Sequence, residues 1–220
     1  MNLHRALRSL LTALVLAHAA TAVDAADRRP VRSLLEIRTE RVVVQEFDLS
    51  CGAAALATLL TYQFGDPVTE REVTRGLIAR EEYLAMPELV RVRQGFSLLD
   101  LKRFVDARGY QGLGYGKLEF HDLVELAPIL IPVDFDGYDH FVVFRGVAGD
   151  RAVIADPAYG NRTMPVGKLI DNWHDSPTFG RVGFVVARPD GSLPPNRLMP
   201  PSRQNVLAPS GAVVRSAIFR

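Results

Sequence analysis

The sequence predicts an α+β fold, in which helices come first and antiparallel strands follow. Two features of the apolar pattern predict it. Between residues 50 and 109, apolar residues recur with helical spacing, and helix-capping residues open the runs. From residue 129 onward, they form short runs rich in Val, Ile and Phe, with turn signals between them. Helices and strands that are segregated along a chain are typical of α+β domains, whereas parallel sheets need alternation.

The first half is expected to contain a central helix that begins at Cys51. Residues 53–60 are apolar on nearly every side apart from Thr58, which indicates a helix surrounded by the protein core. Asp48 or Ser50 can cap this helix, and either choice places Cys51 in its first turn. Three consecutive valines at 42–44 predict a short strand just before it.

Two more helices are expected from local signals. Thr69 and Glu72 have the spacing of a capping box, which predicts that a second helix begins there. Ser97 and Asp100 open a third helix in the same way, and Gly109 ends it.

The second half predicts mainly strands. The expected elements are a strand at 129–133, hairpin strands at 141–147 and 151–156, a short helix near 166–173 and a last strand at 182–187. Ala148-Gly149-Asp150 supplies the hairpin turn.

The composition divides the chain into three parts. Residues 1–25 are expected to be a signal peptide cleaved near Ala25, because a basic leader precedes an apolar stretch about half as long as the ~20 residues of a membrane span. The mature chain would then have no membrane span. Residues 26–188 have an ordinary size for one domain. Residues 189–220 are rich in Pro, Ser, Asn and Arg and are expected to form a disordered tail.

The charges of the chain are balanced. It has 26 Lys and Arg against 25 Asp and Glu, a formal net charge of +1. This balance gives no support for nucleic acid or an anionic membrane as a partner.

Cys51 is the only cysteine of the chain. Exported proteins usually pair their cysteines in disulfides, so a single thiol is either a buried, inert apolar residue or a reactive group. The first turn of a helix supplies partial positive charge and free N–H groups, which favour the thiolate, the nucleophilic form of cysteine. We therefore interpret Cys51 as a candidate nucleophile.

His140 is the best candidate for a general base because of its relation to Asp156. If the hairpin turns at residues 148–150, Val142 lies opposite Asp156, and His140 shares the face of Val142. Asp156 could then hold one imidazole nitrogen and leave the other free for the thiol. A slip of one residue would send the two side chains to opposite faces. The other histidines are weaker candidates: His4, His18, His121 and His174.

Gln45 lies six residues before Cys51 and could stabilise an oxyanion. Its side-chain amide can donate a hydrogen bond to the oxyanion of a tetrahedral intermediate, with the backbone N–H of Cys51 as the second donor. Only its spacing to Cys51 distinguishes it from an ordinary exposed glutamine.

Three motifs together resemble the double-glycine, or bacteriocin-processing, family of papain-like cysteine peptidases. They are Gln-x4-Ser-Cys-Gly-Ala-Ala at 45–54, His-Phe-Val-Val at 140–143 and Ile-Ala-Asp-Pro-Ala-Tyr-Gly at 154–160. The resemblance implies a papain-like fold, with the nucleophile on the central helix packed on an antiparallel sheet. It also implies that Cys51 is the nucleophile, His140 the base, Asp156 the orienting acid and Gln45 the oxyanion donor. Ser50 stands where the family usually has Asp.

The resemblance and the export signal together imply a periplasmic cysteine endopeptidase. It is most similar to stand-alone exported members that accompany secretion systems for fibres or functional amyloid. The expected substrate is a secreted or membrane-delivered protein, cut in a leader or linker at a small-residue site, and no metal or organic cofactor is implied.

Two alternatives stay open at this point. Domains of this family can serve as non-catalytic substrate-docking modules of secretion systems. The same set of residues can also serve an amidase or a transglutaminase-type acyl transferase.

Overall fold

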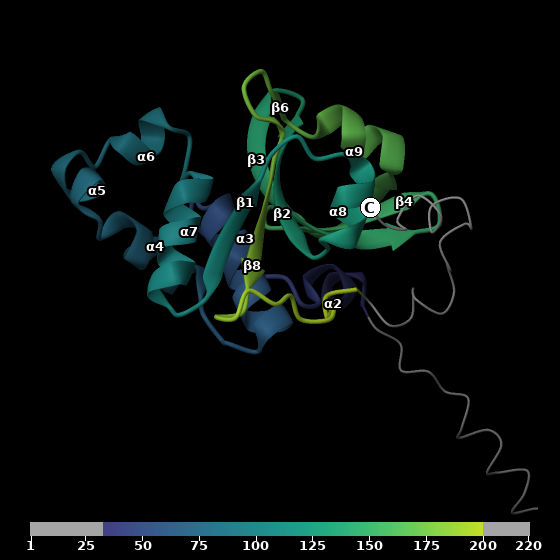
Figure 1. Ribbon diagram of the computed structural model, residues 1–220, viewed down its shortest axis with the longest axis horizontal. Coiled ribbons are helices and arrows are strands. Elements are labelled where there is room, and N and C mark those ends of the chain that lie inside the picture. Colours follow the sequence, from purple (N-terminus) through teal and green to yellow (C-terminus); the bar gives the residue numbers. More distant parts are fainter. Residues whose placement is uncertain (1–32, 200–220) are drawn as a thin grey trace, which may run out of the picture. The chain divides into compact units, whose positions relative to one another are not determined.

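Figure 1 shows the computed structural model of the chain, which describes residues 33–199. The predicted signal peptide, residues 1–25, and residues 200–220 of the predicted tail lie outside the described residues. The described residues from Leu35 onward belong to one compact unit, distinct from Met1–Leu34. Within the described part of the chain, no helix is both long and apolar enough to cross a membrane.

A six-stranded antiparallel sheet lies at the centre of the fold, with the strand order β1-β8-β2-β3-β4-β5. Its strands are β1 (Gln111–Tyr115), β2 (Ile129–Phe135), β3 (Tyr138–Ala148), β4 (Arg151–Asp156), β5 (Gly160–Pro165) and β8 (Gly183–Ala187). The short strands β6 (Asp175–Ser176) and β7 (Gly180–Arg181) form a two-stranded ribbon. The sequence did not predict β1 and β5, because the first is rich in glycine and the second is mostly polar, so neither has an apolar strand pattern.

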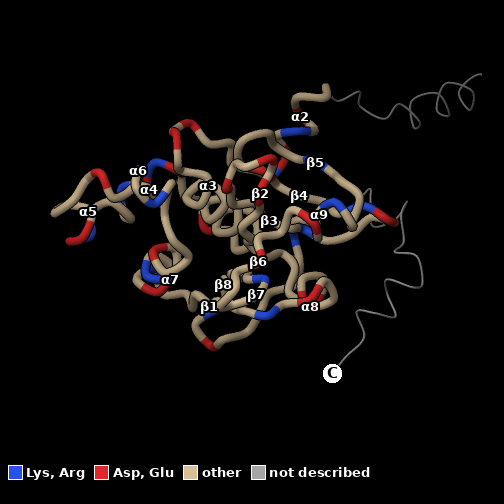
Figure 2. The backbone as a smooth tube through the Cα atoms, turned by 90° about the horizontal axis from the view of Figure 1, so that it is seen from above, with Lys and Arg blue, Asp and Glu red and all other residues tan. Residues whose placement is uncertain are grey.

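Most helices precede the sheet in the chain, which confirms the predicted α+β order. They are α2 (Leu34–Thr39), α3 (Cys51–Thr58), the π-helix η1 (Leu59–Phe64), α4 (Glu70–Ile78), α5 (Glu81–Ala85), α6 (Leu89–Val92), α7 (Leu98–Ala107), α8 (Phe120–Glu125) and α9 (Val166–Asn172). Both capping boxes predicted from the sequence are present, at Thr69–Glu72 and at Ser97–Asp100. Figure 2 shows acidic and basic residues interspersed along these elements.

The two faces of the sheet belong to two hydrophobic cores. On one face, Leu130 of β2 and Val143 of β3 pack with the apolar residues of α3 and α7. On the other face, Ile129 and Ile131 pack with residues of α8 and α9. This alternation along β2 follows from the two-residue period of a strand. Every residue of α3 is buried, as its apolar sequence predicts.

The β3–β4 hairpin combines a tight turn with a bulge. Ala148 pairs with Arg151, so the turn has two residues, Gly149 and Asp150. The register shifts by one residue at Arg145, and Val143 pairs with Ala155. The bulge compensates for the shorter turn and restores, at the open end of the hairpin, the pairing expected from the sequence.

Residues 42–44 do not form the predicted strand, so that prediction is wrong. These residues belong to no strand, and hydrogen bonds of this segment go to other partners. The N–H of Val43 donates to Thr58 Oγ1 (2.9 Å), and the N–H of Gln45 donates to the carbonyl of Pro157 (2.8 Å). The segment thereby connects the buried helix to the end of β4.

The folded region continues past residue 188, where the sequence predicted the tail to begin. Leu198 is completely buried, and its carbonyl accepts hydrogen bonds from the guanidinium of Arg145 at the bulge. The amide of Gln63 donates to the carbonyls of Pro194 (3.2 Å) and Pro195 (3.0 Å). Prolines lack an N–H group but keep a carbonyl, so long side chains of the core can fix this segment. The ordered segment 189–199 therefore belongs to the domain.

We predict that Leu198→Ala lowers the free energy of unfolding by about 2–4 kcal/mol, because it opens a cavity at a site with no exposure. Leu193→Ala is the matched control in the same segment, since Leu193 is 40% exposed and should cost little. Urea unfolding of both variants measures the difference. Equal stabilities would show that the segment is not docked in solution.

Candidate active site

Cys51 is the first residue of α3 and is buried, with 5% exposure. Ser50 is the N-cap residue, and its carbonyl accepts the first hydrogen bond of the helix from the N–H of Ala54 (3.0 Å). The Ser50 side chain does not cap the helix. The thiol therefore lies at the positive end of a helix whose first N–H groups are free of a side-chain cap.

Glu70, the first residue of α4, fixes the loop that leads to Cys51. Its buried carboxylate accepts hydrogen bonds from the N–H groups of Glu46 (2.7 Å) and Phe47 (3.3 Å) and from the Ser50 hydroxyl. The sequence analysis missed this role, because an acid at a helix start is usually exposed. The one signal in the sequence was that Glu70 is a second acid in this helix start, two residues before Glu72 of the capping box.

His140 and Asp156 lie side by side at the open end of the β3–β4 hairpin. The distance between His140 Nε2 and Asp156 Oδ1 is 2.8 Å, and their exposures are 3% and 0%. Asp156 also accepts from the N–H of Ala158 (2.9 Å) and from the guanidinium of Arg162 (3.1 Å). The structure thus brings these two candidate residues together in the register expected from the sequence.

Arg162 is a further residue that the sequence analysis missed. Besides its ion pair with Asp156, its guanidinium lies over the rings of Phe135 (4.8 Å) and Tyr159 (5.6 Å). These contacts hold a positive charge against the far oxygen of Asp156, the one that His140 does not use. Nothing in the local sequence of β5 distinguishes this arginine from an exposed one.

The electrostatics of the pair favour an ion pair of imidazolium and carboxylate. Burial alone would lower the pKa of His140, but its hydrogen bond to Asp156 and its interactions with Cys51 outweigh burial and raise the pKa to about 9. Burial likewise works to raise the pKa of Asp156, yet the bonds from His140, Ala158 and Arg162 hold it below its usual range. His140 is therefore expected to carry a proton at neutral pH.

The second ring nitrogen of His140 is available for chemistry. Nδ1 is buried and has no close hydrogen-bond partner among the described residues, and the nearby Cys51 contributes to the raised pKa of the ring. The ring of Tyr138 lies beside the imidazole, with 5.4 Å between centroids. With Nε2 held by Asp156, Nδ1 is the position from which a proton can pass to or from a group bound at the thiol.

Gln45 lies between the two halves of the site. Its backbone N–H donates to the carbonyl of Pro157, next to Asp156, and its Nε2 donates to the carbonyl of Phe47 (3.1 Å) in the loop before Cys51. Its Oε1 is buried without a partner. The bond to Phe47 occupies one of the two N–H groups of the amide and leaves the second.

A cavity of about 360 Å³ opens onto the thiol. It is lined by Cys51, Arg93, Gln94, Phe96, Ser97, Pro132, Val133, Asp139, His140, Phe141 and His174. Of the weaker histidine candidates, His174 lies in this lining, and its backbone N–H donates to the carbonyl of Pro132 (3.1 Å). His121 instead pairs with Glu119 and Asp122 at the start of α8. Among residues 33–199, no cluster of three His, Cys, Asp or Glu residues could hold a metal ion.

The comparison with known proteins covers most of the described chain. The profile of the Peptidase C39 family matches residues 39–176. A relative from Pseudomonas aeruginosa, named "Probable functional amyloid protease FapD", is 37% identical over 147 residues, or 66% of this chain. The match spans 62% of that relative, less than two thirds of its length. A relative of the same name from Pseudomonas fluorescens is 33% identical over 184 residues, covering 83% of this chain and 79% of the relative.

Two crystal structures share the fold. One is a double glycine motif protease from an AMS/PCAT transporter, in complex with the leader peptide, with 24% identity and a TM-score of 0.51 over 67% of this chain and 90% of that one. The other is the peptidase domain of Streptococcus ComA, a bi-functional ABC transporter, with 16% identity and a TM-score of 0.52 over 67% of this chain and 97% of that one. These likenesses confirm the predicted papain-like peptidase fold.

We predict that the imidazole of His140 titrates near a pKa of about 9 in the folded protein, so it is protonated below that pH and neutral above it. In Asp156→Asn the largest favourable contact is lost and burial remains, so the pKa of His140 should fall well below 9. NMR titration of the imidazole carbons of His140 measures both. An imidazole that titrates near 6.5 in both proteins would contradict the described ion pair.

Proposed function

The chain belongs to the Peptidase C39 family, and on that premise we propose that it is a periplasmic cysteine endopeptidase that cuts a secreted or membrane-delivered protein. The observation that carries the proposal is the buried His140–Asp156 pair, whose free nitrogen is left for the single thiol of the chain. Family membership supports the peptidase assignment. The alternative reading as a docking module would require none of this buried polar arrangement.

The proposed reaction begins at Cys51. Its sulfur attacks the carbonyl carbon of the scissile peptide bond, so that a carbon–sulfur bond forms and the carbonyl oxygen becomes an oxyanion. The remaining N–H of the Gln45 amide and the backbone N–H of Cys51 are the proposed donors to this oxyanion.

His140 then moves the protons. The imidazolium donates its proton to the leaving amine, the carbon–nitrogen bond breaks, and a thioester to Cys51 remains. A water molecule, which the now neutral His140 deprotonates, attacks the thioester, and the thiolate leaves. Asp156 holds Nε2 throughout, and so stabilises the imidazolium form.

The substrate proposal rests on the relatives and on the predicted export signal. Two relatives are named as functional amyloid proteases, which supports a component of a fibre-assembly or secretion system as the substrate. The predicted signal peptide at residues 1–25 supports a periplasmic site of action. The apolar walls of the cavity, which include Phe96, Pro132 and Phe141, suit a flexible segment with small residues at the cut.

We predict that the mature protein cleaves a proteome-derived peptide library and that Cys51→Ala and His140→Ala abolish the cleavage. Gln45→Ala should reduce kcat/KM by about 10²–10³-fold, as expected for the loss of one oxyanion donor. Mass spectrometry of the products measures the cuts, and His121→Ala serves as the control variant with full activity.

The other candidate functions give different products. An acyl transferase would join an added amine, such as glycine ethyl ester, to the new carboxyl end instead of releasing the acid. A docking module would bind peptides without cutting them, and Cys51→Ala would behave like the wild type. Either result would contradict the peptidase proposal.

A further inference from the structure

The cavity at Cys51 has two walls of different origin. Residues of β2 and β3 form one wall, and the segment 93–97, between α6 and α7, forms the other. The second wall approaches the loop before the nucleophile closely. A Cβ atom on Gly95 would lie 3.0 Å from the carbonyl oxygen of Leu49, and Gly95 has a φ of +126°. Whatever fixes this segment therefore also shapes the cavity beside Cys51.

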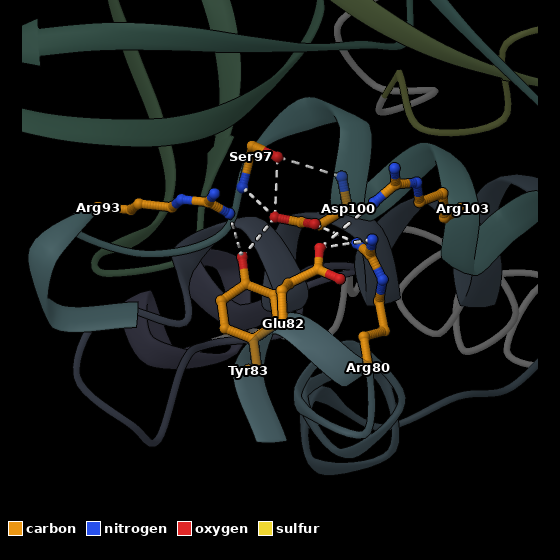
Figure 3. A network of polar contacts seen from close by, with 7 residues as sticks. All are labelled: Arg80, Glu82, Tyr83, Arg93, Ser97, Asp100 and Arg103. Carbon is orange, nitrogen blue, oxygen red and sulfur yellow. Dashed lines mark hydrogen bonds and ion pairs between the residues drawn. The ribbon is translucent and has the colours of Figure 1, made fainter. Parts of the chain in front are cut away.

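Asp100 fixes the second wall, the segment 93–97, through a network of hydrogen bonds. Its carboxylate, 1% exposed, accepts hydrogen bonds from the Tyr83 hydroxyl (2.6 Å), from the N–H (2.9 Å) and hydroxyl (2.8 Å) of Ser97, and from the guanidinium of Arg80. Figure 3 shows Tyr83 of α5, together with Arg80 and Ser97, the residues that directly precede α5 and α7, gathered around Asp100. Burial works to raise the pKa of Asp100, but these donors hold it below its usual range. The network thus joins α5 to the start of α7 around one buried anion.

Arg93 is the residue through which this network reaches the cavity. Its guanidinium donates to the Tyr83 hydroxyl (3.3 Å), a contact drawn in Figure 3. It also lies 5.8 Å from the centre of the Tyr83 ring. Burial and the bond to Asp100 raise the pKa of Tyr83, so its hydroxyl keeps the proton that it gives to Asp100 and accepts from Arg93. Arg93 is therefore held in place although its side chain is exposed.

Arg93 makes no ion pair within the described part of the chain. The other arginines of the network have carboxylate partners: Arg80 pairs with Asp100 and Glu82, and Arg103 pairs with Glu82. Arg93 contacts only a neutral phenol among the described residues, and Asp139, which also lines the cavity, makes no ion pair with it. A guanidinium that lines a substrate cavity and makes no ion pair of its own is suited to bind a carboxylate bidentately.

We propose that Arg93 determines specificity by binding an acidic side chain, Asp or Glu, of the substrate close to the scissile bond. The inference rests on the proposed peptidase function. It adds an electrostatic requirement to a cavity that is otherwise lined mainly by apolar groups and histidines.

The single cysteine allows a direct test that needs no substrate. Iodoacetate and iodoacetamide alkylate the same thiol and differ by one carboxylate. Arg93→Gln should lower the ratio of the iodoacetate rate to the iodoacetamide rate by about two- to fivefold, the order expected for losing one positive charge in a partly hydrated cavity. Arg93→Lys should keep most of the ratio. Arg91→Gln, two residues earlier in α6 and outside the cavity lining, should leave it unchanged.

The second measurement is the specificity profile on a peptide library with Asp, Glu, Gln and Lys varied around the cut. The wild type should prefer Asp or Glu at one position, Arg93→Gln should lose that preference, and Arg93→Glu should prefer Lys there. Cleavage without an acidic preference, or an alkylation ratio that Arg93→Gln does not change, would overturn this inference. Failure of the peptidase function would instead show as no cleavage of any peptide by the wild type or by Arg91→Gln.

Discussion

The hydrogen bond between His140 and Asp156 is the interaction on which the rest of the structure depends. A carboxylate with no exposure is costly unless every oxygen has a partner, and Asp156 obtains its partners from His140, Ala158 and Arg162. The pairing of β3 with β4 must therefore keep one register, since a shift of one residue would separate the two side chains. The bulge at Arg145 keeps that register, and the same Arg145 binds the segment that ends in Leu198.

The three buried carboxylates of the described chain are Glu70, Asp100 and Asp156, and each binds a residue that lines the cavity at Cys51 or directly precedes Cys51. Asp156 holds the imidazole of His140, and Glu70 holds the loop before Cys51. Asp100 holds the segment 93–97, which carries Arg93. Each accepts several hydrogen bonds from groups that are distant in the sequence. Buried polar networks of this kind rigidify their surroundings when they are fully satisfied. The cavity is therefore shaped by fixed charges rather than by apolar packing alone.

Local signals in the sequence were enough for the helices α3, α4, α7 and α9 and for the contact between His140 and Asp156. The capping boxes at Thr69 and Ser97 act within one helical turn, and the hairpin register needs only the position of its turn. The register expected from the sequence held at the open end because a bulge offset the shorter turn, a feature that the apolar pattern does not show. Glu70 and Arg162 could not be found, because the sequence does not distinguish a buried charge from an exposed one. Their roles depend on partners that only the tertiary structure brings near.

The most direct test of the central claim, that His140 acts on Cys51, is the rate of Cys51 alkylation by iodoacetamide as a function of pH. With a single cysteine in the chain, every label reports the same site. The account predicts that, at neutral and mildly acidic pH, the wild type reacts much faster than His140→Ala, because the imidazolium beside the sulfur is lost in the variant. A thiol that reacts with the same pH profile in both proteins, or does not react at all, would contradict it.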